Sequence, residues 1–70
     1  LIDAAKEEYL DYLRAVEPRL TRGALVVADN TKIFRRTLAG YLNRVRTSGR
    51  YESREQDFGA DAMEVSRFLG

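Results

Sequence analysis

Four side chains in this sequence could form a catalytic centre, and they lie in two short segments. Asp3 and Lys6 are three positions apart near the start of the chain, and Asp29 and Asn30 are adjacent. Two carboxylates and an amide oxygen are hard ligands of the kind that magnesium or another divalent cation prefers. A lysine beside them could act as a base on a hydroxyl group. The residue types therefore predict a metal site formed by Asp3, Asp29 and Asn30, with Lys6 as the catalytic residue.

These side chains meet only if they follow neighbouring strands of one sheet. Residues 24–28 form a short continuous apolar run before Asp29, which predicts a strand covered on both faces, as in parallel sheets. Residues 1–2 are predicted to be the end of another strand. Ligands of open α/β sheets bind beyond the carboxyl ends of the strands, and parallel neighbours lie about 5 Å apart. Asp3 and Asp29 are therefore expected to converge.

Two amphipathic helices are predicted beside these strands. Apolar residues recur at helical spacing over residues 6–20, with Asp3 at the N-cap position and Pro18 near the end, where it would finish or kink the helix. A second apolar stripe with the same spacing runs over residues 34–45. This second helix is expected to keep its basic residues mainly on the exposed side.

The rest of the chain predicts two more strands, over residues 51–57 and residues 62–68. The link between them is four residues long, which permits an antiparallel hairpin but not a parallel crossover. The element order β-α-β-α-β-β is typical of an α/β fold. Residues 1–70 contain no repeat, low-complexity tract or linker, so they are expected to form a single module.

Length and composition exclude several classes of function. A chain of 70 residues buries only about 60% of its unfolded surface, which argues against a self-contained enzyme of several parts. Because the sequence has no cysteine and no histidine, disulfides, thiolate or imidazole zinc sites, and Ser-His-Asp or Cys-His catalysis are excluded. No apolar run has the roughly 18 residues of a membrane span, and no signal-peptide pattern is visible, so we expect a cytoplasmic protein.

The charges are nearly balanced in number but not in position. Residues 1–29 carry six acids and four bases, residues 30–51 six bases and no acid, and residues 52–70 five acids and two bases, giving −2, +6 and −3. This basic segment, residues 30–51, contains Phe34 and Tyr41, so a small anion- or RNA-binding module is an alternative function. A solvated, arginine-rich helix face with both aromatic rings in the core explains the same pattern.

Each candidate site residue also has a simpler structural role. Asp3 is a good N-cap for the first helix, and Asn30 or Thr31 could cap the second. Lys6 could be an ordinary solvated lysine on a helix. Taken one at a time, these roles are at least as common as catalytic ones.

The spacing of the whole set, however, resembles a known family. Residues 2–9 read Ile-Asp-Ala-Ala-Lys-Glu-Glu-Tyr, and residues 18–30 read Pro-Arg-Leu-Thr-Arg-Gly-Ala-Leu-Val-Val-Ala-Asp-Asn. Both closely resemble the second half of class I S-adenosylmethionine-dependent O-methyltransferases of the catechol and caffeoyl-CoA O-methyltransferase type. Residues 61–67, Asp-Ala-Met-Glu-Val-Ser-Arg, look like the closing strand of that family. The resemblance implies a partial Rossmann-like sheet with strand order 1-2-4-3, numbered in order of appearance.

The resemblance also implies roles for the site residues. Asp3, Asp29 and Asn30 match the divalent-metal ligands of the family, and Lys6 matches the base that deprotonates the acceptor hydroxyl. The glycine-rich turn that binds the cofactor has no counterpart, because the five glycines include no G-x-G. We therefore expect the metal and acceptor side of a methyltransferase, with S-adenosylmethionine bound by a missing N-terminal half, and no activity in the chain alone.

A third possibility is a purely structural half-domain. A doubly wound sheet cut at its middle exposes a strand edge, and exposed edges invite pairing with another chain. The sequence therefore also predicts self-association into a dimer or a higher assembly.

Overall fold

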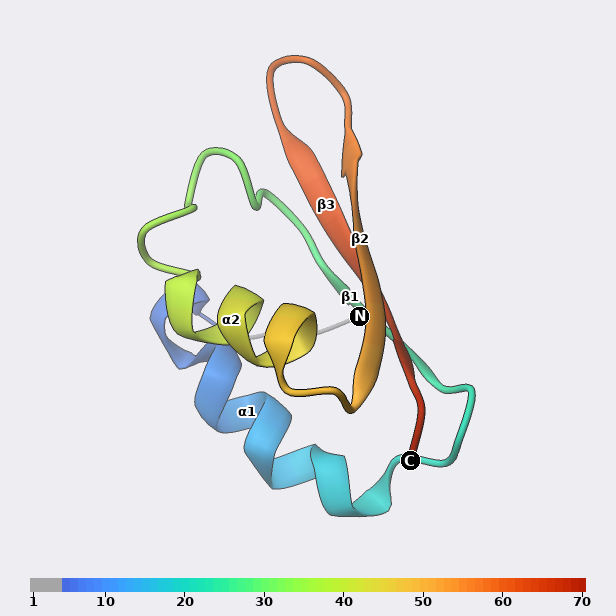
Figure 1. Ribbon diagram of the computed structural model, residues 1–70. Helices are drawn as coiled ribbons and strands as arrows, with labels where there is room; N and C mark the ends of the chain where they lie inside the picture. The colour runs from blue at the N-terminus through green and yellow to red at the C-terminus, as the bar shows by residue number, and fades with distance from the viewer. Residues whose placement is uncertain (1–4) are drawn as a thin grey trace.

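The computed structural model describes residues 5–70, which form two layers with a sheet on one side and helices on the other (Figure 1). The strands are β1 (Leu25–Ala28), β2 (Tyr51–Asp57) and β3 (Ala62–Phe68). The helices are α1 (Tyr9–Val16), which lies between the 3₁₀ turns η1 (Lys6–Glu8) and η2 (Glu17–Arg19), and α2 (Ala39–Thr47). A sheet with helices packed on it makes this a small α/β fold, as the sequence predicts.

The sheet has three strands in the part of the chain that the structure describes, in the order β1-β3-β2. β3 runs antiparallel to both neighbours, with Val65 opposite Val27 of β1 and opposite Arg54 of β2. The antiparallel pairing of the last two strands is therefore confirmed. Among residues 5–70 the sheet is three-stranded and does not have the predicted four-stranded order 1-2-4-3, and the predicted first strand, residues 1–2, lies outside the described residues.

The first helical segment matches the prediction over residues 6–20. It begins as η1, continues as α1 and ends as η2 at Arg19. Pro18 lies in the first turn of η2, where its missing N–H costs no hydrogen bond. No helix among residues 5–70 has the length and apolar character needed to cross a membrane, and the cytoplasmic location stays a prediction.

The second helix begins later than predicted. α2 starts at Ala39, and residues 31–38 follow successive turns instead. Asn30 takes the left-handed conformation, with φ of 58°, which redirects the chain after β1. Thr31 N then donates to the Ala62 carbonyl over 2.9 Å, so the start of this segment is tied to β3. The prediction of a helix from residue 34 was wrong: this segment keeps isolated helical bonds, such as Leu38 N to the Phe34 carbonyl at 2.8 Å, but forms turns up to Leu38.

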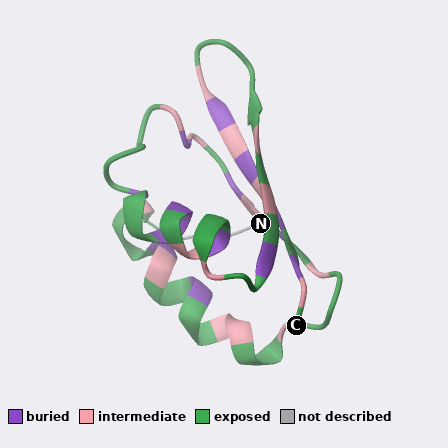
Figure 2. Ribbon diagram, in the orientation of Figure 1, coloured by how far each residue is buried: buried purple, intermediate pink, exposed green. Residues whose placement is uncertain are grey.

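β1 is not covered on both faces, contrary to the prediction. Val26 and Ala28 point toward the helices and are buried, whereas Leu25 is 61% exposed on the opposite face. Figure 2 shows burial concentrated where the sheet and the helices face each other. A continuous apolar run predicts burial on both faces, but α1 and α2 cover only one face of the described sheet.

The core lies between the sheet and the two helices. α1 and α2 approach closely at Gly40, where a Cβ would lie 3.0 Å from Leu10 Cδ2. Tyr9 and Tyr41 meet edge to face across the same helix pair, with ring centroids 5.6 Å apart. The buried core residues are Tyr9, Leu13, Val26, Ala28, Leu38, Tyr41, Leu42, Val45, Tyr51 and Phe68.

Candidate functional site

Three of the four predicted site residues lie together at the end of β1. Lys6 is the first residue of η1, and Asp29 and Asn30 follow β1 directly. Lys6 Nζ donates to the Asp29 carbonyl over 3.1 Å, although the two residues are 23 positions apart. Asp3, the remaining predicted ligand, lies outside the described residues.

Two aromatic residues hold Lys6 in place. Its Nζ atom donates to the Tyr9 hydroxyl over 2.9 Å and lies 4.8 Å from the centroid of the same ring. The Phe34 ring is on another side, with its centroid 5.7 Å from Nζ. Lys6 is therefore half-buried and oriented, and it differs from the freely solvated lysine considered above.

Asn30 connects β1 to the loop before β3. Its Nδ2 group donates to Asp61 Oδ2 over 2.7 Å, and its backbone N–H donates to Asp29 Oδ1 over 2.9 Å. Neither Asn30 nor Thr31 caps α2, because Leu38 occupies the N-cap position of that helix. The capping alternative for these two residues is therefore wrong.

Asp61 is a member of the site that the sequence reasoning did not identify. Its Oδ1 atom accepts the backbone N–H groups of Lys32, Ile33 and Ala62 at 3.2, 3.3 and 2.8 Å. The Asn30 amide, together with these N–H groups, holds the pKa of Asp61 below its ordinary value. A sequence signal was present, since an aspartate in a short hairpin link readily binds nearby backbone N–H groups. We call Lys6, Asp29, Asn30 and Asp61 the strand-end cluster.

Within the strand-end cluster, Asp29 and Asn30 carry carboxylate and amide oxygens, the donor types that hard divalent cations prefer. Among residues 5–70, no three carboxylate, imidazole or thiolate side chains lie close enough together to hold a metal ion. The exposed Asp29 carboxylate and the Asn30 amide nevertheless place two oxygen ligands on adjacent residues. No hydrogen bond of the described chain engages Asp29 Oδ2 or Asn30 Oδ1. A cation bound here would therefore use Asp29 and Asn30, with Asp3 as the third ligand that the family resemblance implies.

The basic segment, residues 30–51, finds its partners inside the fold. Four of its six bases pair with carboxylates from the two acidic flanks, and these pairs are Lys32–Asp57, Arg35–Glu55, Arg44–Glu17 and Arg46 with Glu55 and Glu64. Only Arg36 and Arg50 lack an ion pair among the described residues. Tyr41 is buried in the core as expected, whereas Phe34 is 39% exposed and its ring lies beside Lys6, so the expectation that both rings lie in the core was wrong for Phe34. The arrangement gives no specific support to nucleic-acid binding.

A second polar cluster, formed by Glu64, Arg46 and Ser53, lies where α2 meets β2 and β3. Glu64 is fully buried in β3, where it accepts from Arg46 Nη2 at 2.7 Å and from Ser53 Oγ at 2.6 Å. Burial alone would raise the pKa of Glu64, but the bonds from Arg46 and Ser53 outweigh it and leave the pKa below its ordinary value. Because each group in this cluster is paired with another, its role is to hold β2, β3 and α2 together.

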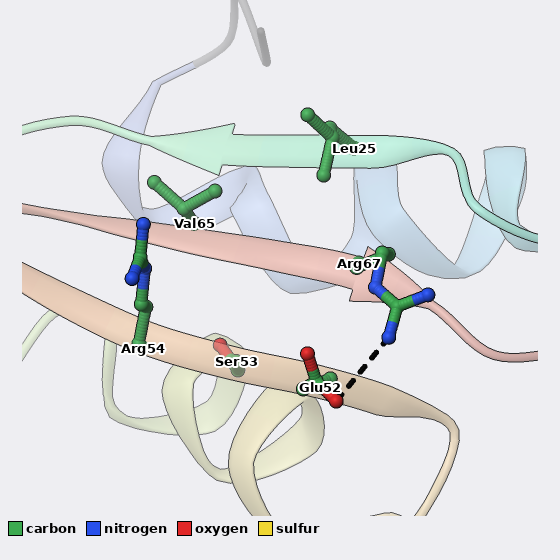
Figure 3. Close-up of a pocket in the computed structure, with 6 residues that line it drawn as sticks. All are labelled: Leu25, Glu52, Ser53, Arg54, Val65 and Arg67. Carbon is green, nitrogen blue, oxygen red and sulfur yellow. Dashed lines mark ion pairs between the residues drawn. The ribbon is translucent and has the colours of Figure 1, made fainter.

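The outer face of the sheet carries a hollow that faces away from the helices (Figure 3). Leu25 and Val65 supply its apolar part, and Glu52, Arg54 and Arg67 supply its charged part, with Ser53 behind them. Arg67 and Glu52 form an exposed ion pair at 3.2 Å.

Comparison with known proteins does not assign the chain to a family. No protein-family model matches it, and no curated protein matches it. The geometry of the strand-end cluster and the motif resemblance are therefore the features of the chain that indicate a function.

Proposed function

We propose that the chain is the metal- and acceptor-binding part of an S-adenosylmethionine-dependent O-methyltransferase. The observation that carries the proposal is the contact of Lys6 Nζ with the Asp29 carbonyl, next to Asn30. Residues far apart in the sequence thereby come together in the pairing that the resemblance implies for base and ligands. The sequence lacks a glycine-rich cofactor turn, so the cofactor would be bound by an N-terminal half supplied separately.

The strand arrangement supports the same proposal. The resemblance implies that the closing strand inserts antiparallel between its two neighbours, and β3 lies antiparallel between β1 and β2. In the proposed partial Rossmann-like sheet, a strand ending at residues 1–2 would pair with the other edge of β1. The missing half would then complete the sheet and cover the outer face on which Leu25 is exposed.

The chain's own residues would move the proton and hold the acceptor. The acceptor hydroxyl gives its proton to a neutral Lys6 amine. The electron pair that this leaves on the acceptor oxygen forms the bond to the methyl carbon of S-adenosylmethionine. The methyl–sulfur bond breaks, and its electron pair returns to sulfur. A neutral amine has two N–H groups and one lone pair. Because Tyr9 and the Asp29 carbonyl engage two N–H groups of Lys6, the lone pair remains for the acceptor proton.

A divalent cation, when bound, supplies positive charge that stabilises the developing oxygen anion. Asp29 and Asn30 would hold it, together with Asp3. The aromatic rings of Tyr9 and Phe34 flank the Lys6 amine, with their centroids 4.8 and 5.7 Å from Nζ. This combination fits an acceptor that carries a free hydroxyl group, such as a catechol.

The test supplies the amino-terminal half of a methyltransferase of this type in trans and measures methyl transfer to a catechol. We expect transfer that requires Mg²⁺ and stops with EDTA, and no transfer by the 70-residue chain alone. Lys6→Met should reduce the rate at least about 100-fold, as expected for loss of a general base.

Lys32→Met is the matched control, because Lys32 is the only other lysine and pairs with Asp57 outside the site. It should keep the wild-type rate. An inactive reconstituted protein would contradict the methyltransferase assignment. Activity in the isolated chain would contradict the proposal that a separate N-terminal half binds the cofactor.

A further inference from the structure

We propose that Asp61 is a positioning residue that turns the carboxamide of Asn30 so that its oxygen faces away from Asp61 and is available as a ligand. This inference rests on the function proposed above, because it takes Asn30 as a metal ligand. It adds a residue that the motif resemblance does not assign and that only the folded chain brings to the site.

The chemistry of the contact fixes which end of the amide faces Asp61. An ionised carboxylate only accepts hydrogen bonds, and a carboxamide has one donor end and one acceptor end. Asn30 Nδ2 lies 2.7 Å from Asp61 Oδ2, so the donor end faces the carboxylate. The two ends diverge from the same carbon, and Asn30 Oδ1 is therefore directed away from Asp61 without a hydrogen-bond donor from the described chain.

Asp61 is itself held rigidly. Its other oxygen, Oδ1, accepts the backbone N–H groups of Lys32, Ile33 and Ala62 at 3.2, 3.3 and 2.8 Å. A carboxylate with one oxygen fixed by three donors cannot rotate freely, so Oδ2 stays directed at Asn30. The carboxylate of Asp61 is the acceptor in all four of its contacts, so the end of the Asn30 amide that meets it is the donor end.

The backbone of Asn30 contributes to the same arrangement. Its left-handed conformation lets its N–H group donate to Asp29 Oδ1 over 2.9 Å while its side chain reaches Asp61. Asp29 Oδ2 and Asn30 Oδ1 are then the two oxygens of the pair without an N–H donor from the described chain. Asp61 thus performs for Asn30 what second partners of metal-binding histidines do, which is to orient the ligand.

The variant Asp61→Asn separates orientation from folding. Its Oδ1 atom can keep the backbone N–H groups of the loop, but Nδ2 now replaces the acceptor that faced Asn30. The Asn30 amide must then rotate to present its oxygen to residue 61, and its nitrogen takes the ligand position. We expect at least about tenfold weaker binding of Mn²⁺ to the 70-residue chain, measured by water-proton relaxation.

Two further variants distinguish orientation from loss of charge. Asn30→Asp combined with Asp61→Asn restores both the total charge and a matched contact, because the new amide donates to the new carboxylate and leaves its second oxygen free. This double variant should bind Mn²⁺ within about threefold of the wild type. Asp57→Asn removes the same charge from the same hairpin, where Asp57 pairs with Lys32, and should change the affinity less than about threefold.

The wild-type chain provides a readout that needs neither a variant nor a metal. By NMR, the side-chain NH₂ of Asn30 should exchange with water more slowly than that of exposed Asn43. Unprotected Asn30 protons, or wild-type affinity in Asp61→Asn, would overturn the inference. A protected amide in a chain that binds no Mn²⁺ would support the orientation while refuting the metal site and the methyltransferase proposal.

Discussion

Glu64 has no exposed surface, and its charge is balanced mainly by one arginine. Arg46 reaches it through two bonds, Nη2 to Oε1 at 2.7 Å and Nε to Oε2 at 3.1 Å. Burial of a carboxylate without a partner is one of the largest destabilising effects in proteins. The ion pair between Arg46 and Glu64 is therefore expected to make a large contribution to the free energy of unfolding.

Replacing Arg46 by methionine should lower the free energy of unfolding by about 2 to 3 kcal/mol. This figure is smaller than the roughly 3 to 5 kcal/mol of a fully buried pair, because the Arg46 side chain is 36% exposed. Urea unfolding followed by circular dichroism measures the change. Arg67→Met removes the exposed pair with Glu52 and should cost less than about 1 kcal/mol. Equal losses in the two variants would contradict the importance of burial.

Acid should unfold the protein partly through Glu64 and Glu17. The pKa of Glu17 is held down chiefly by Arg44, and that of Glu64 is held down by Arg46 and Ser53 against burial. A depressed pKa in the fold means that the unfolded chain binds protons more readily, so the stabilisation is present above the ordinary value of 4.5 and is lost as the pH falls below it. In Glu64→Gln this side chain no longer titrates, so the urea midpoint should decline less steeply between about pH 5 and about pH 3 than in the wild type. A decline as steep as that of the wild type would exclude Glu64 as a source.

The sequence contained only part of the information about single residues. Asp29, Asn30 and Lys6 could be selected because their types and positions after predicted strands indicate a ligand site. Glu64 could not, because the apolar residues Met63 and Val65 on either side of it would be expected to face the core, yet in the structure Glu64 is the buried one of the three. Which face of a strand meets the helices is decided by packing, and a charged residue on that face becomes tolerable only through a distant partner such as Arg46.

Among the elements, α1 packs on the rest of the fold mainly through its two buried residues, Tyr9 and Leu13. Leu13 is completely buried, whereas its neighbour Tyr12 is 45% exposed. Leu13→Ala should destabilise the protein by about 2 to 5 kcal/mol, the range for a buried leucine that leaves a cavity. Tyr12→Ala should cost less than about 1 kcal/mol, as expected for a surface change. Thermal unfolding measures both, and a similar loss from both variants would show that α1 is not held through Leu13.

The positions of elements were predictable where local pattern decides them. Residues 6–20 and residues 62–68 follow their predicted spans because helical spacing and strand alternation agree there with the packing. The start of α2 was not predictable from residues 34–38, since their apolar spacing continues that of the helix. Asn30, Thr31 and Asp61 shift that boundary through bonds to the loop and strand that follow much later in the chain.

At the scale of the whole molecule, the exposed outer face around Leu25 predicts self-association. β1 pairs only with β3 among the described residues, and Leu25 is 61% exposed beside Val65. We expect the isolated chain to dimerise or assemble further by covering this surface. Leu25→Lys should weaken the association at least about tenfold, a change of about 1.4 kcal/mol, measured by sedimentation equilibrium in the ultracentrifuge.

Phe58→Lys provides a matched control for that experiment. Phe58 is also 61% exposed and apolar, but it lies in the hairpin link far along the chain from β1. Its replacement should leave the association as in the wild type. A wild-type chain that stays at 8.0 kDa at high concentration would contradict the prediction.

The position of β3 has a consequence for how the chain acquires its shape during synthesis. β1 and β2 do not pair with each other, and both depend on β3, the last of the three strands along the sequence. A ribosome that has released residues 5–57 has therefore produced both flanking strands but no ladder to join them. The joining of β1 to β2 must therefore wait until β3 has emerged, so the part of the sheet that residues 5–70 form is completed late in synthesis.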